Sequence, residues 1–166
     1  MLIPAILKKE EIEEHFKCYF NSDDMMYETG NLDNWIPCIT EDNGNVQYAI
    51  VDKEGKLLGY FGYYIDWYTS SASRFGLFSF DRGNRIIGID ILKEMRKLIH
   101  KYRLHRIEWR MVGGNPVEKH YDKFCQKYNG RKLVLHDAIK DRYGKYHDDV
   151  IYEIIFKEKK SESKNQ

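Results

Sequence analysis

The chain has 166 residues and a mass of 19.9 kDa, which suits one domain with its own core and argues against a multidomain protein. Its 27 basic and 26 acidic residues leave a net charge of +1, so binding of nucleic acid would need a local basic patch. No run approaches the roughly 20 apolar residues of a membrane span, and Glu10 and Glu11 stand where a secretory signal would be apolar. Cys18, Cys38 and Cys125 lack the spacing of a zinc site, so we expect reduced thiols and a cytoplasmic protein.

The N-terminal segment predicts a short strand followed by a helix. Residues 2–7 are apolar, and Pro4 within them favours an edge strand. Two glutamates then occupy the first turn of the predicted helix, where negative charge is favourable. The apolar residues of this helix recur every four positions, at Ile12, Phe16 and Phe20. Residues 21–45 mix turn formers with isolated apolar residues and predict a loop with one helical turn at most.

A change of pattern after residue 45 predicts three consecutive strands. Residues 46–52, 56–67 and 71–80 are rich in β-branched and aromatic side chains and are separated by short connections. Strands joined in this way form an antiparallel meander. Gly76, inside the third strand, is a candidate for a β-bulge.

The next stretch predicts a long helix and a strand. The apolar stripe of the helix, expected over residues 85–102, consists of Ile87, Ile91, Met95, Leu98 and Tyr102. Residues 106–112 alternate as a strand does. A strand–helix–strand crossover makes the strands 71–80 and 106–112 parallel, so the sequence predicts an α+β fold with a mixed, mostly antiparallel sheet.

The C-terminal third predicts a further helix and a strand pair. The residues Asn115 to Glu118 predict a helix start, with Asn115 as N-cap and Pro116 at the first helical position. The apolar stripe of this helix is Val117, Tyr121, Phe124 and Tyr128. Residues 131–139 and 147–156 predict strands. We expect one domain over residues 1–157 and a disordered charged tail over 158–166.

The turn between the third meander strand and the long helix is a candidate binding site. It carries two glycines and two arginines, Gly83, Gly88, Arg82 and Arg85. A helix N-terminus presents unpaired N–H groups and a partial positive charge, which suits a diphosphate. A purely structural explanation is equally available, in which Gly83 and Asn84 form the turn and cap the helix.

This order of elements, together with this turn, resembles the GNAT acetyltransferase superfamily over residues 2–156. The resemblance implies a sheet of about seven strands with helices on both faces, and one parallel strand pair at the site of acetyl-CoA. In the family the turn carries the motif (Gln/Arg)-x-x-Gly-x-(Gly/Ala). The cofactor-binding residues that the resemblance implies are Phe78, Phe80, Arg82, Gly83, Asn84, Arg85, Ile86, Gly88 and Asn115.

Two registers of the family motif fit the turn in part. One keeps Arg85 and Gly88 but puts Asp90 where a small residue belongs. The other makes Gly88 the last glycine, and Gly83 and Ile86 then replace the Arg and the middle glycine. The helix periodicity that follows favours the second register.

Catalytic residues follow from the same resemblance. The family commonly uses a Tyr on the second of these helices to protonate the departing CoA thiolate, and Tyr121 is the candidate, with a packed core tyrosine as the alternative. Cys125 stands at the same place if the end of the helix is aligned instead. A carboxylate commonly deprotonates the amine, and Glu108 and Asp66 are the candidates.

Other patterns give alternatives from different classes. The His-Asp pairs at 136–137 and 147–149 could meet across the last two strands, but charged hairpin ends are usually solvated and we predict no metal. The aromatic run at residues 60–68 could stack on bases, as in RNA-binding modules, although such residues more often form core pairs.

The sequence therefore predicts an N-acetyltransferase that transfers acetyl from acetyl-CoA to a primary amine by direct attack, mainly through positioning. A non-catalytic GNAT-like binding protein and an RNA-binding module remain the alternatives. We expect an amine acceptor, either a small molecule or a protein, and no membrane partner. A homodimer is one of the assemblies that the sequence leaves open.

Overall fold

The computed structural model describes residues 1–19, 22, 27, 37–40 and 44–156. Its strands are β1 (Leu2–Pro4), β2 (Asn45–Val51), β3 (Leu57–Asp66), β4 (Ser71–Ser79), β5 (Arg106–Val112), β6 (Arg131–Lys140) and β7 (Tyr146–Ile155). Its helices are the 3-10 helix η1 (Ala5–Lys8) and the α-helices α1 (Lys9–Tyr19), α3 (Arg85–His100) and α4 (Glu118–Lys127). The strands predicted from β2 onward and the long helix lie within about two residues of these bounds.

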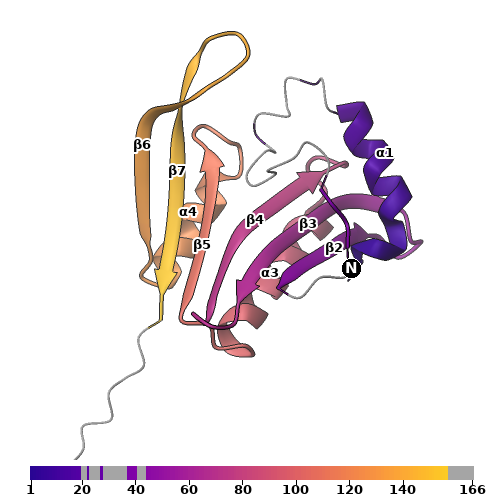
Figure 1. Ribbon diagram of the computed structural model, residues 1–166, viewed down its shortest axis with the longest axis horizontal. Coiled ribbons are helices and arrows are strands. Elements are labelled where there is room, and N and C mark those ends of the chain that lie inside the picture. Colours follow the sequence, from indigo (N-terminus) through magenta and orange to yellow (C-terminus); the bar gives the residue numbers. More distant parts are fainter. Residues whose placement is uncertain (20–21, 23–26, 28–36, 41–43, 157–166) are drawn as a thin grey trace, which may run out of the picture.

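The seven strands form one sheet in the order β1-β2-β3-β4-β5-β7-β6 (Figure 1). Neighbouring strands are antiparallel except β4 and β5, which are parallel. The crossover through α3 requires this parallel pair. The predicted α+β fold with a mixed, mostly antiparallel sheet is confirmed.

Helices cover the two faces of the sheet unequally. On one face, Ile12 and Phe16 of α1 pack in a core with Tyr60 and Phe78. The other face carries α3 and α4, whose buried residues form a second core with the aromatic and aliphatic side chains of β3, β5 and β7. In Figure 1, α3 and α4 lie behind the sheet and α1 lies beside β2 and β3 at the other end from β6.

Two predictions in the first half of the chain are corrected. The apolar segment 2–7 is a strand only as far as Pro4, after which Ala5 begins the 3-10 helix. The bulge in β4 is not at Gly76: the pairing with β3 shifts so that Arg74 and Phe75 lie opposite Tyr63. Arg74 adopts φ +56°, which a bulge residue requires. Phe20, most of the loop 21–45 and the tail 158–166 lie outside the described residues.

The start of α4 also differs from the prediction. The helix begins at Glu118, and its N-cap is Val117 rather than Asn115. Asn115 instead forms the turn before the helix, because its Oδ1 accepts the N–H of Val117 at 3.2 Å. Glu118 reaches back to accept the N–H of Gly114 at 3.0 Å, so a capping-box type of contact exists one residue earlier than predicted.

Candidate functional site

Strands β4 and β5 pair over a very short length and then diverge. Their ladder contains two residue pairs, Ser71–Arg106 and Ala72–Ile107. Beyond them the described residues form no further pairs between the two strands. Each strand is fully paired on its other side, to β3 and to β7 respectively.

Ladder alternation determines which main-chain groups face this divergence. The N–H of Phe80 donates to Leu58 at 2.9 Å, so Phe80, Phe78 and the alternate residues of β4 bond to β3. The groups of Leu77 and Ser79 then point toward β5. On β5, Gly113 donates to Asp148 at 2.8 Å, which fixes the alternation with β7.

The same reasoning on β5 directs the main-chain groups of Glu108 and Arg110 toward β4. Two strand edges with free hydrogen-bonding capacity therefore face each other. An extended ligand that carries amide groups could bond to both edges as an additional strand does.

The N-terminus of α3 follows directly on β4. Asn84 caps the helix, since its Oδ1 accepts the N–H of Ile86 at 3.0 Å, and its Nδ2 donates to Asp81 at 2.9 Å. Helix geometry leaves the N–H groups of Arg85 and Ile87 without an acceptor inside the helix. This end of α3 thus keeps the features that an anion requires, with the exposed Arg85 beside it.

Two glycines leave space at this helix start. Gly83 has φ +82°, a conformation that favours glycine and that the turn requires. Gly88 lies in the helix, and no atom of the described residues lies within 4 Å of the position that a Cβ would take there. Neither packing nor backbone conformation within the described chain therefore explains a glycine at position 88.

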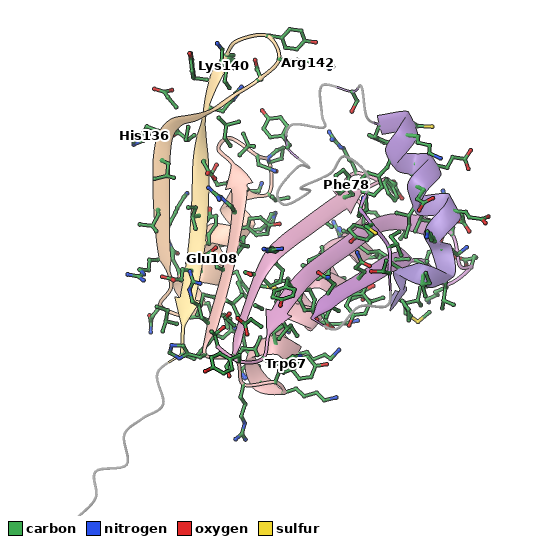
Figure 2. All side chains as sticks on the ribbon, in the orientation of Figure 1. Trp67, Phe78, Glu108, His136, Lys140 and Arg142 are labelled. Atoms are coloured by element: carbon green, nitrogen blue, oxygen red, sulfur yellow. The ribbon has the colours of Figure 1, made fainter. Side chains whose placement is uncertain are left out.

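The aromatic residues at the end of β4 serve the core with their side chains. Phe78 is fully buried against Phe16, with ring centroids 4.1 Å apart, and Phe80 stacks on His15 at 4.4 Å. Figure 2 shows Phe78 close to α1. Leu77 and Ser79 were missed at the sequence level, because only the pairing register shows which main-chain groups face outward.

The two catalytic candidates lie on opposite faces of β5. Tyr121 of α4 stands edge-on to Trp109 and Tyr152, at 6.0 Å from each, and burial raises the pKa of Tyr121 to about 12. Glu108 precedes Trp109 on the strand and so faces away from α4, where it is ion-paired with Arg106 (Figure 2). The two side chains do not meet.

Trp109 has an additional property on the α4 face. Its Nε1 is buried and has no hydrogen-bond partner among the described residues. Since buried donors are nearly always satisfied in native proteins, an unpaired indole N–H requires an explanation. It is a donor that a bound molecule could use.

The remaining candidates have structural partners. Asn115 donates from Nδ2 to the carbonyl of Tyr27 at 3.0 Å in addition to its turn contact. Cys125 is buried, its Sγ donates to the carbonyl of Arg131 at 3.5 Å, and burial raises its thiol pKa, which disfavours the thiolate. Asp66 accepts the N–H groups of Tyr68 and Thr69 in the β3–β4 turn.

The histidines of the last hairpin form two separate pairs. His136 contacts Asp148 at 3.2 Å, and His147 contacts Asp141 at 3.0 Å. Over the described part of the chain, no group of three or more His, Cys, Asp and Glu side chains is placed to hold a metal ion. None of the helices in this part has the length and apolar character that crossing a bilayer requires.

The aromatic run of β3 does not form a stacking surface. Tyr60, Phe61 and Tyr63 are each less than 5 % exposed and belong to the two cores. Trp67 and Tyr68, at the turn after the strand, are the exposed members of the run. Most of these aromatics thus have the core role that was weighed against base stacking.

Comparisons with known proteins place this arrangement in a structural class. No protein-family model and no curated protein sequence matches the chain. The solved structures that resemble it include mutant forms of the spermidine/spermine N-acetyltransferase SpeG from Vibrio cholerae, with a TM-score of 0.58, 17% identity, and coverage of 86% of this chain and 90% of that one. The fold is that of the GNAT N-acetyltransferases.

Two more solved structures agree with the GNAT fold. The same Vibrio cholerae enzyme in complex with manganese ions gives a TM-score of 0.56 at 19% identity, over 69% of this chain and 67% of that one. A chimera of SpeG and hSSAT gives 0.55 at 19% identity, over 69% and 70%. The resemblance predicted from the sequence is confirmed at the level of the fold.

Proposed function

We propose that this protein is an N-acetyltransferase that transfers an acetyl group from acetyl-CoA to a primary amine in the cytoplasm. The GNAT fold supports this proposal, and the similar structures are named as enzymes that acetylate spermidine or spermine. The observation that carries it is the divergence of β4 and β5 directly beside the N-terminus of α3. An extended ligand with amide groups and a diphosphate matches both features.

The residues of this chain fit acetyl-CoA in specific ways. Main-chain groups of Leu77 and Ser79 on β4, and of Glu108 and Arg110 on β5, would hold the amide-bearing arm. The first turn of α3 would hold the diphosphate through its N–H groups, with charge supplied by Arg85. Gly88 supplies the room for close approach. Asn84 shapes the turn, and Gly83 allows its conformation.

The opposite placement of Glu108 and Tyr121 suits proton transfer on two sides of a bound thioester. When bound, acetyl-CoA supplies the activated acyl carbon between the two strands. Glu108 takes a proton from the incoming amine on the α1 face of β5. Tyr121 donates a proton toward the departing sulfur on the α4 face, and its pKa of about 12 keeps it protonated at neutral pH.

The binding step is tested with Gly88→Ala. Alanine in a helix is more stable than glycine by roughly 0.5–1 kcal/mol, so the unliganded variant should melt at a higher temperature than the wild type. If Gly88 lies against the ligand, the rise in melting temperature caused by acetyl-CoA should shrink or disappear. Leu92→Ala, at an exposed position on the same helix, is the matched control and should keep the full rise. An undiminished rise in Gly88→Ala would contradict the proposed site.

The chemical step is tested by release of free CoA thiol with a panel of amines. We expect turnover with at least one primary amine and large losses of kcat in Tyr121→Phe and Glu108→Gln. Binding of acetyl-CoA with no turnover on any amine would favour the non-catalytic GNAT-like protein. Stabilisation by an oligonucleotide and not by acetyl-CoA would favour the RNA-binding alternative.

A further inference from the structure

Strand β6 is an exposed edge that carries apolar side chains. It is the last strand of the sheet and pairs only with β7 among the described strands, at the far end from α1 (Figure 1). Consecutive apolar residues Leu133, Val134 and Leu135 are 49%, 38% and 47% exposed. Soluble proteins usually protect an edge strand with charges, proline or a bulge, because its unpaired main chain can bind another strand.

The protective features of β6 lie outside this apolar segment. Arg131 and Lys132 precede it, and the bulge follows it, between Leu135 and Ile139. The part between is a regular strand that pairs with β7 residue by residue. A regular, apolar and exposed edge is therefore available over Arg131–Leu135.

Alternation identifies the main-chain groups that face outward. On β7, the residues on either side of Asp149 bond to β5, as the Asp148–Gly113 contact shows, so Asp149 and Ile151 bond to β6. Their β6 partners are Leu135 and Leu133. Consequently Lys132 and Val134 direct their N–H and C=O groups away from the sheet.

The face of β6 opposite α4 has no helix over it within the described chain, and its charges cancel. Leu133 and Leu135 lie on this face beside Ile151. The neighbouring charges are paired within the sheet, Arg110 with Asp149 and Arg131 with Glu153. A locally neutral, apolar surface matches an equally neutral surface better than it matches a polyanion.

We propose that β6 pairs antiparallel with β6 of a second copy of this chain, around a two-fold axis at Val134. The segment is self-complementary in this register. Leu133 comes opposite Leu135 of the second copy, and basic Arg131 comes opposite acidic Asp137. Val134 meets its own equivalent, and their outward N–H and C=O groups bond reciprocally.

The neighbouring register fits less well. An axis at Leu133 would also align outward-facing main-chain groups, but it would place Arg131 opposite Leu135 and leave Asp137 without a basic partner. The axis at Val134 matches apolar with apolar and opposite charges with each other. The sequence of β6 thus selects both the partner, which is a second copy, and the register.

The first test is Val134→Pro, measured by light scattering after size exclusion. The N–H of Val134 is not used in the β6–β7 ladder, so proline there blocks pairing across the edge and leaves the fold intact. We expect a wild-type mass twice the 19.9 kDa of the chain and a variant mass of 19.9 kDa, with unchanged circular dichroism. Leu92→Lys, at another exposed leucine, should stay dimeric. A monomeric wild type, or a dimeric Val134→Pro variant, would overturn the proposal.

The second test fixes the register by disulfide formation in the full chain carrying Cys18→Ser and Cys38→Ser. Val134→Cys should form an intermolecular disulfide in mild oxidant, because the two copies of this residue meet at the axis. Lys132→Cys is the matched control: its two copies would be about 14 Å apart along the strands, too far for a disulfide. Equal cross-linking of both variants, or cross-linking at Lys132 alone, would contradict the register.

Discussion

The two halves of the sheet are stabilised differently. Strands β1 to β4 are covered by α1 on one face and α3 on the other, and both faces carry buried apolar residues. Strands β5, β7 and β6 have α4 on one face, while ion pairs such as Arg110–Asp149 occupy the other. The first half therefore depends mainly on apolar burial, and the second half depends partly on charge pairs at its open face.

The contrast also concerns what each half can offer to other molecules. Two covered faces leave the first half few free surfaces, apart from the edge of β4 and the start of α3. The second half keeps an uncovered face and an exposed edge strand. Four predictions below test how far this division holds.

The largest effect is expected from Phe16→Ala in the doubly covered half. Phe16 is fully buried between α1 and the sheet, so its truncation should lower the free energy of unfolding by about 3–5 kcal/mol. Urea denaturation measures this. Ile155→Ala, on β7 and 37% exposed, should cost less than about 1 kcal/mol. Similar losses in both variants would remove the contrast between the halves.

Glu153→Gln tests the charge pairs of the other half. Glu153 accepts hydrogen bonds from Arg106 at 2.6 Å and from Arg131 at 2.7 Å. Because hydrogen bonds to charged groups are stronger than neutral ones, we expect a loss of about 2 kcal/mol at pH 7.

The pH dependence of this variant gives a second readout. The hydrogen bonds from Arg106 and then Arg131 lower the pKa of Glu153 below its ordinary 4.5, against the opposing effect of burial. The contribution of Glu153 to stability is therefore complete above pH 4.5 and is lost as the pH falls through the lowered pKa of the folded state. The difference between wild type and Glu153→Gln should shrink over that acidic range. A difference that is independent of pH would show that the ion pairs do not contribute.

Tyr63→Phe tests the one charged cluster buried in the first half. Glu94 of α3 accepts hydrogen bonds from Tyr63 at 2.7 Å and Tyr48 at 3.1 Å, and Lys97 lies 3.1 Å away. Burial and the contact with Glu94 raise the pKa of Tyr63. Loss of one donor to a buried carboxylate should cost about 1.5 kcal/mol in urea denaturation. Tyr128→Phe, in the turn after α4, is the control and should be nearly neutral.

The smallest effect is expected from Asn84→Ala, which removes the cap of α3. N-cap substitutions of this kind cost about 1 kcal/mol, so the melting temperature should fall by a few degrees. In the proposed function the same variant should also weaken the stabilisation by acetyl-CoA, because Asn84 shapes the anion-binding turn. Asn45→Ala, at the exposed start of β2, is the control. A change in stability without a change in acetyl-CoA binding would restrict Asn84 to a structural role.

Much of the fold could be predicted from the sequence where local signals and burial agree. The stripe Ile87, Met95 and Leu98 predicts α3, and these residues are buried as the periodicity requires. The alternating segment 106–112 coincides with β5. The segment 2–7 was predicted less well, because a short apolar run does not distinguish a strand from a 3-10 turn.

The candidate site could be predicted only in part. Glycines and arginines at the start of α3 gave a local signal. The roles of Leu77 and Ser79 depend on how β4 pairs with β3, which is a property of the tertiary structure and leaves no pattern in the residues themselves. The bulge at Arg74 is similar, because its position follows from register and not from the nearby glycine.

The two-pair ladder between β4 and β5 has a mechanical consequence. With so few hydrogen bonds across this boundary, the halves of the sheet are joined chiefly through side-chain packing on α3 and α4. A molecule that bonds to both edges would complete the missing rungs and couple the halves into one stiffer body. Amide hydrogen exchange along β5 should then slow when that molecule is bound, at positions far from any direct contact.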